Sequence, residues 1–589
     1  MTSTTAPSKL YASFVFDGNE AALQFWGSIP LNVNDAIALS RPLSAVYREE
    51  KQPLFTHERL IVLCQTIKEI HQKHEMLTPM VTHRLELLES QHAAVEAGHQ
   101  PSLLGGPGLV INKLAAIGQI AMLQNTASIM FVGDHDHEQK ELTVIHLPSP
   151  GPRGLSFSFN VPREFRQSPM HALPLPSRSW LNQALEKIAS TYHELVTKSS
   201  SHQKAEYEDR VQSVIKIIQH AFDKAKTISD WSLLIWMQLA NLSQDSGILF
   251  QQFSHPTLRL LMLPAFEFLI HVRNRSRYIQ ALNQAAEQLQ QLGYQPGIGH
   301  RTEDYVPFQL ECPTAGCNRT RLDPTLANES AMRMEISARC PKCKVTHTLE
   351  LKPTSPDLSD WAEFLSPRVD TRAFLVQSYT PIILHIGGSG ETSYHAQVSP
   401  ALEALDSLAP IFFRYTRQYY GNPWTTQQAQ ILEQEGIMPL DLKELRFYGK
   451  AIVTASEEKN SGVVRSLFGA SAELIAHSVE QLIQAEQQLE QDRNEAIRQQ
   501  RDSPDAKIRE SYRVMVGRYT RQRQILQTYL SQMFGRYAPE RLGQEVSFAW
   551  IDGAISLGPQ NYFPRLLSHY QTYTPSSATY FLPNNPNAK

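Results

Sequence analysis

The sequence predicts an α/β fold whose core is a parallel β-sheet with helices on both faces. The first observation is the succession of an apolar run at residues 93–97, a glycine-rich loop, an amphipathic segment at 109–123 and a second apolar run at 128–132. Short apolar runs separated by a helix are typical of parallel strands that are buried on both faces. The second observation is that strand, glycine turn and helix recur at residues 381–395. We therefore expect two halves of one sheet.

The length and composition of the chain limit the class of protein. A chain of 589 residues is too long for one hydrophobic core, so several domains are expected. The formal net charge of -3 argues against electrostatic binding to nucleic acid or to an anionic membrane. The first residues lack the pattern of a signal peptide, and the apolar stretch 258–272 is interrupted by Arg259 and Glu267 and is too short to span a bilayer. We expect a cytoplasmic protein.

Changes of pattern divide the chain into eight segments. They are an N-terminal helical segment (1–88), the first part of the core (89–147), a helical connecting insertion (148–245), a core strand with helices (246–300), a cysteine-rich ribbon insertion (301–365), the second part of the core (366–454), a coiled coil (455–535) and a C-terminal tail (536–589). Proline and serine dominate residues 148–176, which indicates a linker or a loop-rich excursion. Residues 247–253 are a candidate third strand, with a helix beginning near Pro256.

Polar side chains follow the predicted strands. His99 and Gln100 come after the first strand, and the second ends in Gly133 followed by the acidic and histidine run 134–138. The carboxyl ends of strands in an open α/β sheet meet in one crevice, where such sheets bind ligands. A site that contains residues from both runs is therefore expected at this edge.

The run after the second strand could hold an ammonium group and supply a base. Its candidate catalytic residues are Asp134, His135, Asp136 and Glu138, and His135 is the candidate base because an unshifted histidine pKa lies nearest to 7. Two other interpretations stay open. The run could be a solvated strand end that caps the next helix, or a site for a divalent ion.

Glycine turns and arginines are the candidate groups for binding anions. Backbone N–H groups at a helix N-terminus suit anionic oxygens, and the two candidate turns are 105–108 and 387–390. The glycines could equally serve only to permit tight turns. Arg372 and Arg414 could clamp a carboxylate or could be ordinary ion-pair partners. His99 could be catalytic or a buried, hydrogen-bonded residue.

Two pairs of cysteines predict a metal site. Cys312 and Cys317 form one pair, Cys340 and Cys343 the other, and each pair leads into a predicted β-hairpin. Four thiolates leave no open coordination position, so a structural zinc ion is expected. His347 is an alternative fourth ligand, whereas Cys64 lies in an apolar run and is expected to be a buried core thiol.

Residues 455–535 show the seven-residue repeat of a coiled coil. The repeating positions are Phe468, Ile475, Leu482, Leu489 and Ala496 on the first arm, and Tyr512, Tyr519, Leu526 and Met533 on the second. The turn lies at 501–505, so the two arms are antiparallel. Two arms packed against each other bury only one apolar stripe of each helix, which favours packing against a partner chain in a homodimer. The last stretch, 575–589, is rich in proline and asparagine and is expected to be disordered.

The chain resembles the BshC family in five blocks that occur in the order of that family. They are Gly98–Pro101 continuing to Gly106-Pro107 and Asn112-Lys113, Gly133–Asp136 with Glu138 and Glu141, Ser366–Arg372, His385–Tyr394, and Gly535–Pro539. The resemblance implies a Rossmann-like core split by two insertions, with a coiled coil used for dimerisation. This chain departs from the family pattern at His99, where glutamine is usual, and in its cysteine-rich ribbon.

The resemblance also implies a reaction and a set of site residues. The family is associated with joining the carboxyl of cysteine to the amine of glucosaminyl-malate in bacillithiol biosynthesis, with ATP or ADP as a candidate cofactor. The residues expected to bind substrate are Gln100, Gly105, Gly106, Asn112, Lys113, Arg372, Gly387, Gly388, Gly390, Glu391, Tyr394 and Arg414. Lys113, one turn inside its helix, is expected to be a surface or phosphate contact. Two alternatives are a metal-dependent phosphoryl or nucleotidyl transferase and a non-catalytic scaffold.

Overall fold

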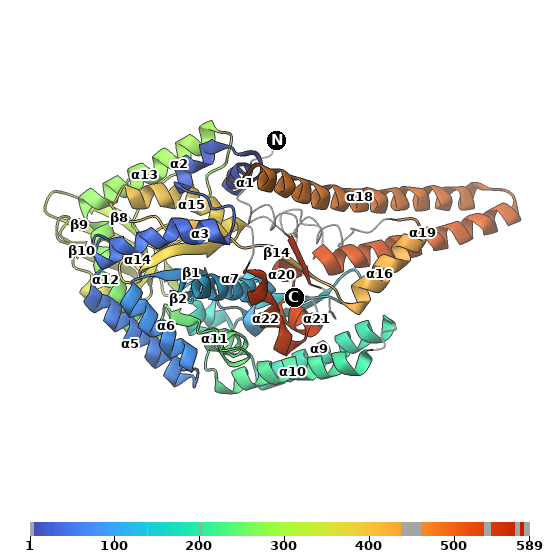
Figure 1. The fold of residues 1–589 in the computed structure, drawn as a ribbon, viewed down its shortest axis with the longest axis horizontal. Helices are drawn as coiled ribbons and strands as arrows, with labels where there is room; N and C mark the ends of the chain where they lie inside the picture. Colours follow the sequence, from blue (N-terminus) through green and yellow to red (C-terminus); the bar gives the residue numbers. More distant parts are fainter. Residues whose placement is uncertain are drawn as a thin grey trace.

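A five-stranded parallel sheet forms the centre of the protein in a computed structural model (Figure 1). The structure describes residues 5–137, 140–199, 203–437, 461–534, 544–571 and 578–581. The strand order is β13-β12-β1-β2-β5. The strands are β1 (Ala94–His99), β2 (Ala127–Val132), β5 (Leu249–Gln252), β12 (Ile382–Gly387) and β13 (Ile411–Arg414). The predicted α/β core, including its third strand and its second half, is confirmed.

The direction of the connections reverses in the middle of the sheet. Helix α7 (Gly108–Gln124) leads from β1 to β2, and α15 (Ser389–Glu403) leads from β12 to β13 in the opposite direction. Right-handed crossovers therefore place these two helices on opposite faces. The reversal lies between β1 and β12, where an open α/β sheet forms its ligand crevice.

Helix α7 is buried on nearly all sides, so the amphipathic pattern expected for it is wrong. One side packs against β1, β2 and β12, and the other against the C-terminal helices α20 (Gln544–Ser547), α21 (Trp550–Leu557) and α22 (Pro559–His569). Only the end of the helix reaches solvent, at Met122 and Leu123. The burial of α7 could not be predicted from its own sequence, because the helices that cover it lie more than 400 positions away in the chain.

The described part of the C-terminal segment, which was expected to be a tail, is therefore part of the core. Trp550 and Tyr562 are fully buried, and the indole N–H of Trp550 donates to the carbonyl of Leu104 at 2.8 Å. Strand β15 (Ala578–Phe581) pairs in parallel with β14 (Arg417–Tyr420). This strand corrects the prediction that the whole stretch 575–589 is disordered.

The remaining helices surround this core. The N-terminal helices are α1 (Pro7–Asp17), α2 (Leu23–Trp26), α3 (Val33–Ser40), α4 (Ser44–Arg48), α5 (His57–Lys73) and α6 (Pro79–Gln91). The later ones are α12 (Pro256–Ile270), α13 (Val272–Gln291), α14 (Arg372–Gln377) and α16 (Pro423–Gln434). Cys64 is buried in α5, as expected of a core thiol. None of the described helices combines the length and apolar character needed to cross a lipid bilayer.

Two insertions interrupt the core. The first contains α8 (Lys140–Thr143), β3 (Val144–Leu147), β4 (Leu155–Ser158), α9 (Arg178–Lys198), α10 (Lys204–Lys224) and α11 (Ile228–Met237). The second contains β6 (Phe308–Glu311), β7 (Arg321–Leu322), β8 (Thr325–Glu329), β9 (Met334–Arg339), β10 (Thr346–Leu351) and β11 (Leu365–Pro367). These strands form two small antiparallel sheets, β10-β9-β8 and β11-β6-β7. The second sheet leads directly into α14 and the site.

Two long helices, α18 (Ser461–Asp502) and α19 (Ala506–Phe534), project from the body side by side (Figure 1). The turn lies where the sequence predicted it. Arg523 of α19 pairs with Glu486 of α18 at 2.6 Å, while Arg493 donates to Thr520 at 3.0 Å, so the helices run antiparallel. Predicted repeat positions such as Leu482 and Leu526 are buried between them. The side chains of Phe468 and Ile475 lie outside the described part of the structure.

Candidate functional site

The loops after β1, β2 and β12 meet at one edge of the sheet. Gln100 after β1 donates to the carboxylate of Asp136 after β2 at 2.8 Å. Lys113 of α7 donates to the carbonyl of Gly98 at 2.9 Å and contacts Glu391 of α15 at 2.7 Å. These contacts join residues from both halves of the split sheet. The expected meeting of the two halves is therefore observed.

Lys113 and Glu391 form a shielded ion pair at the reversal point of the sheet. The side chain of Lys113 is only 3% exposed and that of Glu391 15%. Glu391 also accepts the N–H of Gly388 at 2.8 Å. Burial would raise the pKa of Glu391, but Lys113 and His385 outweigh it and lower the pKa to about 2. The prediction of a surface contact for Lys113 is wrong, because the lysine is buried between the end of β1 and the first turn of α15.

Glu96 and His385 join this cluster and were missed by sequence reasoning. They face each other on adjacent strands, and the imidazole Nδ1 of His385 contacts the Glu96 carboxylate. The Nε2 atom of His385 lies 4.0 Å from Glu391. The available signal was a charged or polar residue inside an otherwise apolar strand, which is costly unless it is paired.

Arg372 and Tyr394 complete the charged wall. Arg372, the first residue of α14, donates to the Tyr394 hydroxyl at 2.9 Å, and its guanidinium lies 5.6 Å from the ring centre of Phe131. Burial would lower the pKa of Arg372, but Tyr394 and Glu96 outweigh it and raise the pKa. Arg414, the second predicted clamp, is the last residue of the edge strand β13, and its guanidinium lies 5.9 Å from the Tyr11 ring of α1.

Asp134 anchors the loop after β2 and does not face a substrate. Its side chain is fully buried, and its oxygens accept hydrogen bonds from the N–H and hydroxyl of Ser254 at 2.9 and 2.6 Å and from Ser229 at 3.1 Å. The expectation that Asp134 receives an ammonium group is therefore wrong. Asp136 is half-buried and stays at the site, while Glu138 lies outside the described residues.

His99 and His135 are both neutral at pH 7. Burial lowers the pKa of each to about 4. The Nδ1 atom of His99 lies 2.8 Å from the carbonyl of Gln100, and a carbonyl only accepts, so Nδ1 carries the proton and Nε2 carries the lone pair. His135 packs 4.5 Å from the ring centre of Phe253. The expectation of an unshifted pKa for His135 is therefore wrong, because burial against an apolar ring disfavours the charged imidazole.

The N–H groups of the first glycine turn are used within the protein. Gly105 and Gly106 donate to the carbonyls of Ser102 and Leu103 at 3.1 and 3.0 Å, and Gly108 donates to Phe548 at 3.0 Å. Gly105 and Gly106 have φ of 83° and 76°, a conformation that favours glycine. The turn therefore serves chain reversal, and the predicted anion contacts at Gly105 and Gly106 are wrong.

The second glycine turn is also shaped by packing. A Cβ at Gly387 would lie 2.5 Å from Phe412, and one at Gly388 would lie 2.7 Å from Tyr415. The N–H of Gly388 is already bonded to Glu391, so it too is not available to an anion, whereas Gly390 is exposed beside open space.

Asn112 holds the C-terminal segment to α7. It is fully buried, donates to the carbonyl of Thr416 at 2.8 Å and accepts from the side chains of Gln418 and Tyr570. Its predicted contact with substrate is therefore wrong.

Two cavities of different size lie near this edge of the sheet, and the smaller is lined by residues of the charged cluster. The larger, of about 760 Å³, lies beside the start of α7 and is bordered by His99, Gln100, Lys140, His146 and Phe548. This volume falls within the range of small-molecule sites. The smaller, of about 20 Å³, lies among Glu96, Arg372, His385 and Tyr394 and has room for one water molecule. His99 lines the larger cavity, and the charges of Lys113 and Glu391 are close enough to affect its pKa. His99 therefore lies between the larger cavity and the charged cluster.

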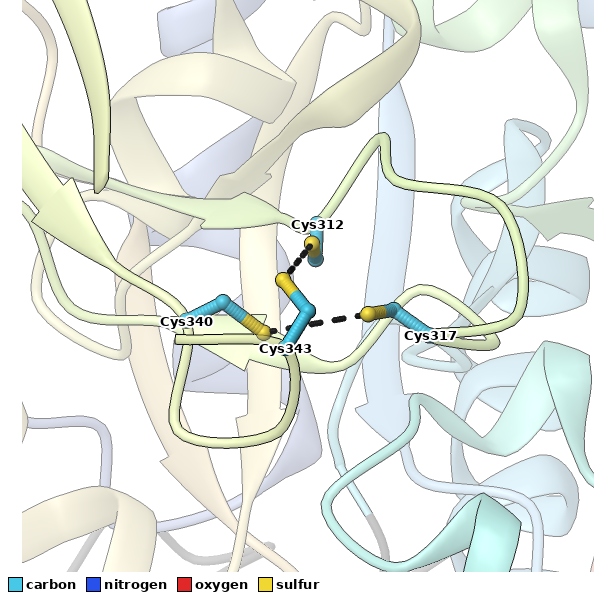
Figure 2. A group of neighbouring side chains, drawn as sticks. All are labelled: Cys312, Cys317, Cys340 and Cys343. Atoms are coloured by element: carbon cyan, nitrogen blue, oxygen red, sulfur yellow. Dashed lines mark hydrogen bonds between the residues drawn. The ribbon is translucent and has the colours of Figure 1, made fainter. Parts of the chain in front are cut away.

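The four predicted metal ligands converge in the ribbon (Figure 2). All four sulfur atoms lie within 4.8 Å of one another, with 3.9 Å between Cys312 and Cys343 and 4.0 Å between Cys317 and Cys340. Tetrahedral zinc with Zn–S bonds of about 2.3 Å requires sulfurs about 3.8 Å apart. The cluster could therefore hold a metal ion. The Nε2 atom of His347 lies 3.5 Å from the sulfur of Cys312, beside the four thiols. Among the described residues, no other such group of histidine, cysteine and acidic side chains is found.

Stability is expected to fall as the pH drops from 6.5 to about 4. The unfolded chain binds more protons than the folded one in this interval, because the folded pKa values of His99 and His135 are depressed. Each histidine contributes up to about 3 kcal/mol above pH 6.5. Urea unfolding at pH 7, 5.5 and 4.5 should show a smaller loss with acidification for His99→Gln than for the unchanged protein. Identical losses for both proteins would contradict the assignment for His99.

Comparison with known proteins gives a consistent result. Residues 43–415 match the family model described as bacillithiol biosynthesis BshC, N-terminal Rossmann-like domain. The provisionally named cysteine ligase BshC of Bacillus mycoides (strain KBAB4) is 22% identical over 372 residues, which cover 61% of this chain and 60% of the relative. The protein of that name from Bacillus cereus (strain AH187) is 20% identical over 397 residues, covering 63% and 67%. The match to the first relative thus spans less than two thirds of its length. Since the family model covers more than half of the chain and ends just after β13, this protein belongs to the BshC family.

Proposed function

We propose that the protein is a ligase that joins the carboxyl group of L-cysteine to the amine of glucosaminyl-malate, or of a related thiol precursor, as the last step of bacillithiol biosynthesis. The observation that carries this proposal is the family match over residues 43–415, which contains all five strands of the sheet and the residues that follow β1, β2 and β12. The names of the relatives support a cysteine ligase.

The amino-sugar conjugate is proposed to bind in the cavity of about 760 Å³ beside His99 and Gln100. Its amine is an ammonium group in solution and must lose one proton before it attacks the activated carbonyl and another as the amide forms. Asp136 is proposed to hold the ammonium group, because its carboxylate is placed at the crevice by Gln100. The Nε2 lone pair of His99 is proposed to receive the proton that the amine loses as the amide forms, since His99 is neutral at pH 7.

Carboxylates of the substrates are proposed to pair with Arg372. Its guanidinium presents several N–H donors in a fixed fork, and one of them donates to the Tyr394 hydroxyl at 2.9 Å. The carboxyl of cysteine must be activated before an amide can form, and ATP is the proposed co-substrate. A carboxylate oxygen of cysteine would attack a phosphorus of ATP and break a P–O bond of the nucleotide. The amine would then attack the carbonyl carbon, and the phosphate would leave with that oxygen as the C–N bond forms.

The experiment for this proposal is a reconstituted reaction. Purified protein is incubated with cysteine, glucosaminyl-malate and ATP, and the thiol product is sought by mass spectrometry, with each component omitted in turn. Product that requires both cysteine and the conjugate supports the proposal. Lack of product with ATP and with other nucleoside triphosphates would contradict it.

Two structural roles belong to the same proposal. The four-cysteine cluster is proposed to hold a structural zinc ion, because sulfur-only ligation leaves no position for a substrate. The hairpin of α18 and α19 is proposed to act as a coiled coil that pairs two copies of the chain, since its arms expose Val514 to 64% together with Ile497, Ile508 and Met515. In sedimentation, the unchanged protein should then be a dimer. Val514→Lys should dissociate into single chains at protein concentrations at which the unchanged protein remains a dimer.

A further inference from the structure

We infer that the metal-bound cysteine cluster positions the loop 133–137 of the substrate site, acting through Arg321. This inference rests on the proposed metal and not on the proposed ligase reaction. The ribbon lies outside the sheet, yet its side chains contact this loop and the segment that supports it. Its role would then be to order one wall of the crevice and not only to fold itself.

Residues in the turns that carry the cysteines adopt left-handed backbone conformations, and a bound metal would hold them in place. Gly316 has φ of 80°, and Asn318 and Arg319, which follow Cys317, have φ of 51° and 59°. Lys344, which follows Cys343, has φ of 66°. Left-handed conformations of residues other than glycine persist only where surrounding structure holds them. Four thiolates bound to one ion would supply that constraint at both turns.

The first of these turns sets the direction of two arginines. Arg319 and Arg321 lie two and four positions after Cys317. Arg319 donates to the carboxylate of Glu311 at 2.8 Å, and Glu311 is the residue directly before Cys312. Glu311 in turn binds Arg259 of α12 at 2.6 Å, with both side chains 3% exposed. The cysteine turn is thus attached to the core through a buried ion pair.

Arg321 carries the connection to the site. Its guanidinium lies 2.8 Å from Nδ1 of His137, the last described residue of the loop after β2. Its backbone N–H donates to the carbonyl of Gln167 at 2.9 Å. A few residues on, the N–H groups of Met170 and His171 donate to the carbonyls of Asp136 and Asp134 at 2.8 and 3.0 Å. Arg321 therefore holds the loop directly and also holds the segment 167–171 that braces it.

The ribbon also reaches the opposite wall of the site. Strand β6, which ends at Glu311, pairs with β11, and Arg368 just after β11 donates to the carbonyl of Val306 at 2.7 Å. Helix α14 then begins at Arg372. Release of the metal should therefore loosen both walls, the loop 133–137 more directly.

Hydrogen exchange read by mass spectrometry tests this inference without any substrate. Peptides covering 131–137 and 167–171 are compared for the full-length protein, Arg321→Ala, Arg321→Lys and the control Arg333→Ala, whose arginine lies on the same ribbon but pairs with Glu350 at its outer face. Zinc per chain is measured for each protein. Arg321→Ala should keep its zinc and raise exchange in the peptide 131–137 about tenfold, the effect of losing the charged hydrogen bond to His137. The peptide 167–171 should change less, because the backbone N–H of residue 321 still donates to Gln167. Arg321→Lys should restore most of the protection, and Arg333→Ala should leave it unchanged.

Removal of the metal gives the second measurement. Cys340→Ser, or the full-length protein treated with a chelator, should lose zinc and show faster exchange in both peptides, 131–137 and 167–171, because the backbone N–H of Arg321 that holds Gln167 also belongs to the ribbon. Unchanged exchange in those peptides after zinc is lost would overturn the inference, as would the absence of bound zinc in the unchanged protein. Neither outcome bears on the ligase reaction, which is read from its product.

Discussion

Replacing Lys113 with methionine is expected to lower the free energy of unfolding by about 3–5 kcal/mol. The lysine is almost completely buried and neutralises Glu391, whose charge in the first turn of α15 would lose its lysine partner. The substitution also removes the hydrogen bond to the carbonyl of Gly98. Urea unfolding at pH 7 measures the change.

Two controls separate this effect from the general loss of a lysine. Lys198→Met removes the exposed pair with Glu194 and should cost less than about 1 kcal/mol. The double variant Lys113→Met with Glu391→Gln removes both charges and should recover a large part of the lost stability. A cost for Lys113→Met as small as that for Lys198→Met would show that the pair is not shielded as described.

Replacing Arg372 with alanine is expected to lower kcat/KM in the proposed reaction by at least about 100-fold, which corresponds to about 2.7 kcal/mol. A guanidinium that pairs with a substrate carboxylate inside a crevice contributes a charged hydrogen bond, and its loss leaves that carboxylate unpaired. The rate of product formation by mass spectrometry gives the measurement.

The conservative and the distant variants define what Arg372 does. Arg372→Lys keeps the charge but loses the fork, so it should remain well below the unchanged protein. Arg277→Ala removes an exposed arginine that pairs with Asp406 and should have no effect on the rate. Activity of Arg372→Ala within a few-fold of the unchanged protein would remove Arg372 from the substrate site.

Local patterns were sufficient for the elements of the core. Apolar runs that end at a glycine predicted β1, β2 and β12, because a strand buried on both faces leaves an unbroken apolar segment. The four cysteines were found from spacing, since chelating pairs on tight turns are a local property. Residues at the ends of strands were also expected to share an edge, and the contact from Gln100 to Asp136 fulfils this.

The roles of individual residues at that edge depended on partners distant in the chain. Asp134 and Asp136 are two positions apart in the chain. The hydroxyls of Ser229 and Ser254 donate to the carboxylate of Asp134, whereas the carboxylate of Asp136 stays at the crevice. His135 has an ordinary sequence context, but burial against Phe253 lowers its pKa.

The sequence by itself determined that this protein has a split parallel sheet, a cysteine cluster and a long helical hairpin, because each follows from side-chain periodicity or spacing within a short segment. Only the tertiary structure decided which polar groups remain accessible. It buried α7 beneath the C-terminal helices, and it paired Lys113 with Glu391 across 278 positions. Burial and charge pairing are set by neighbours in space, and those neighbours come from segments whose order along the chain does not reveal their proximity.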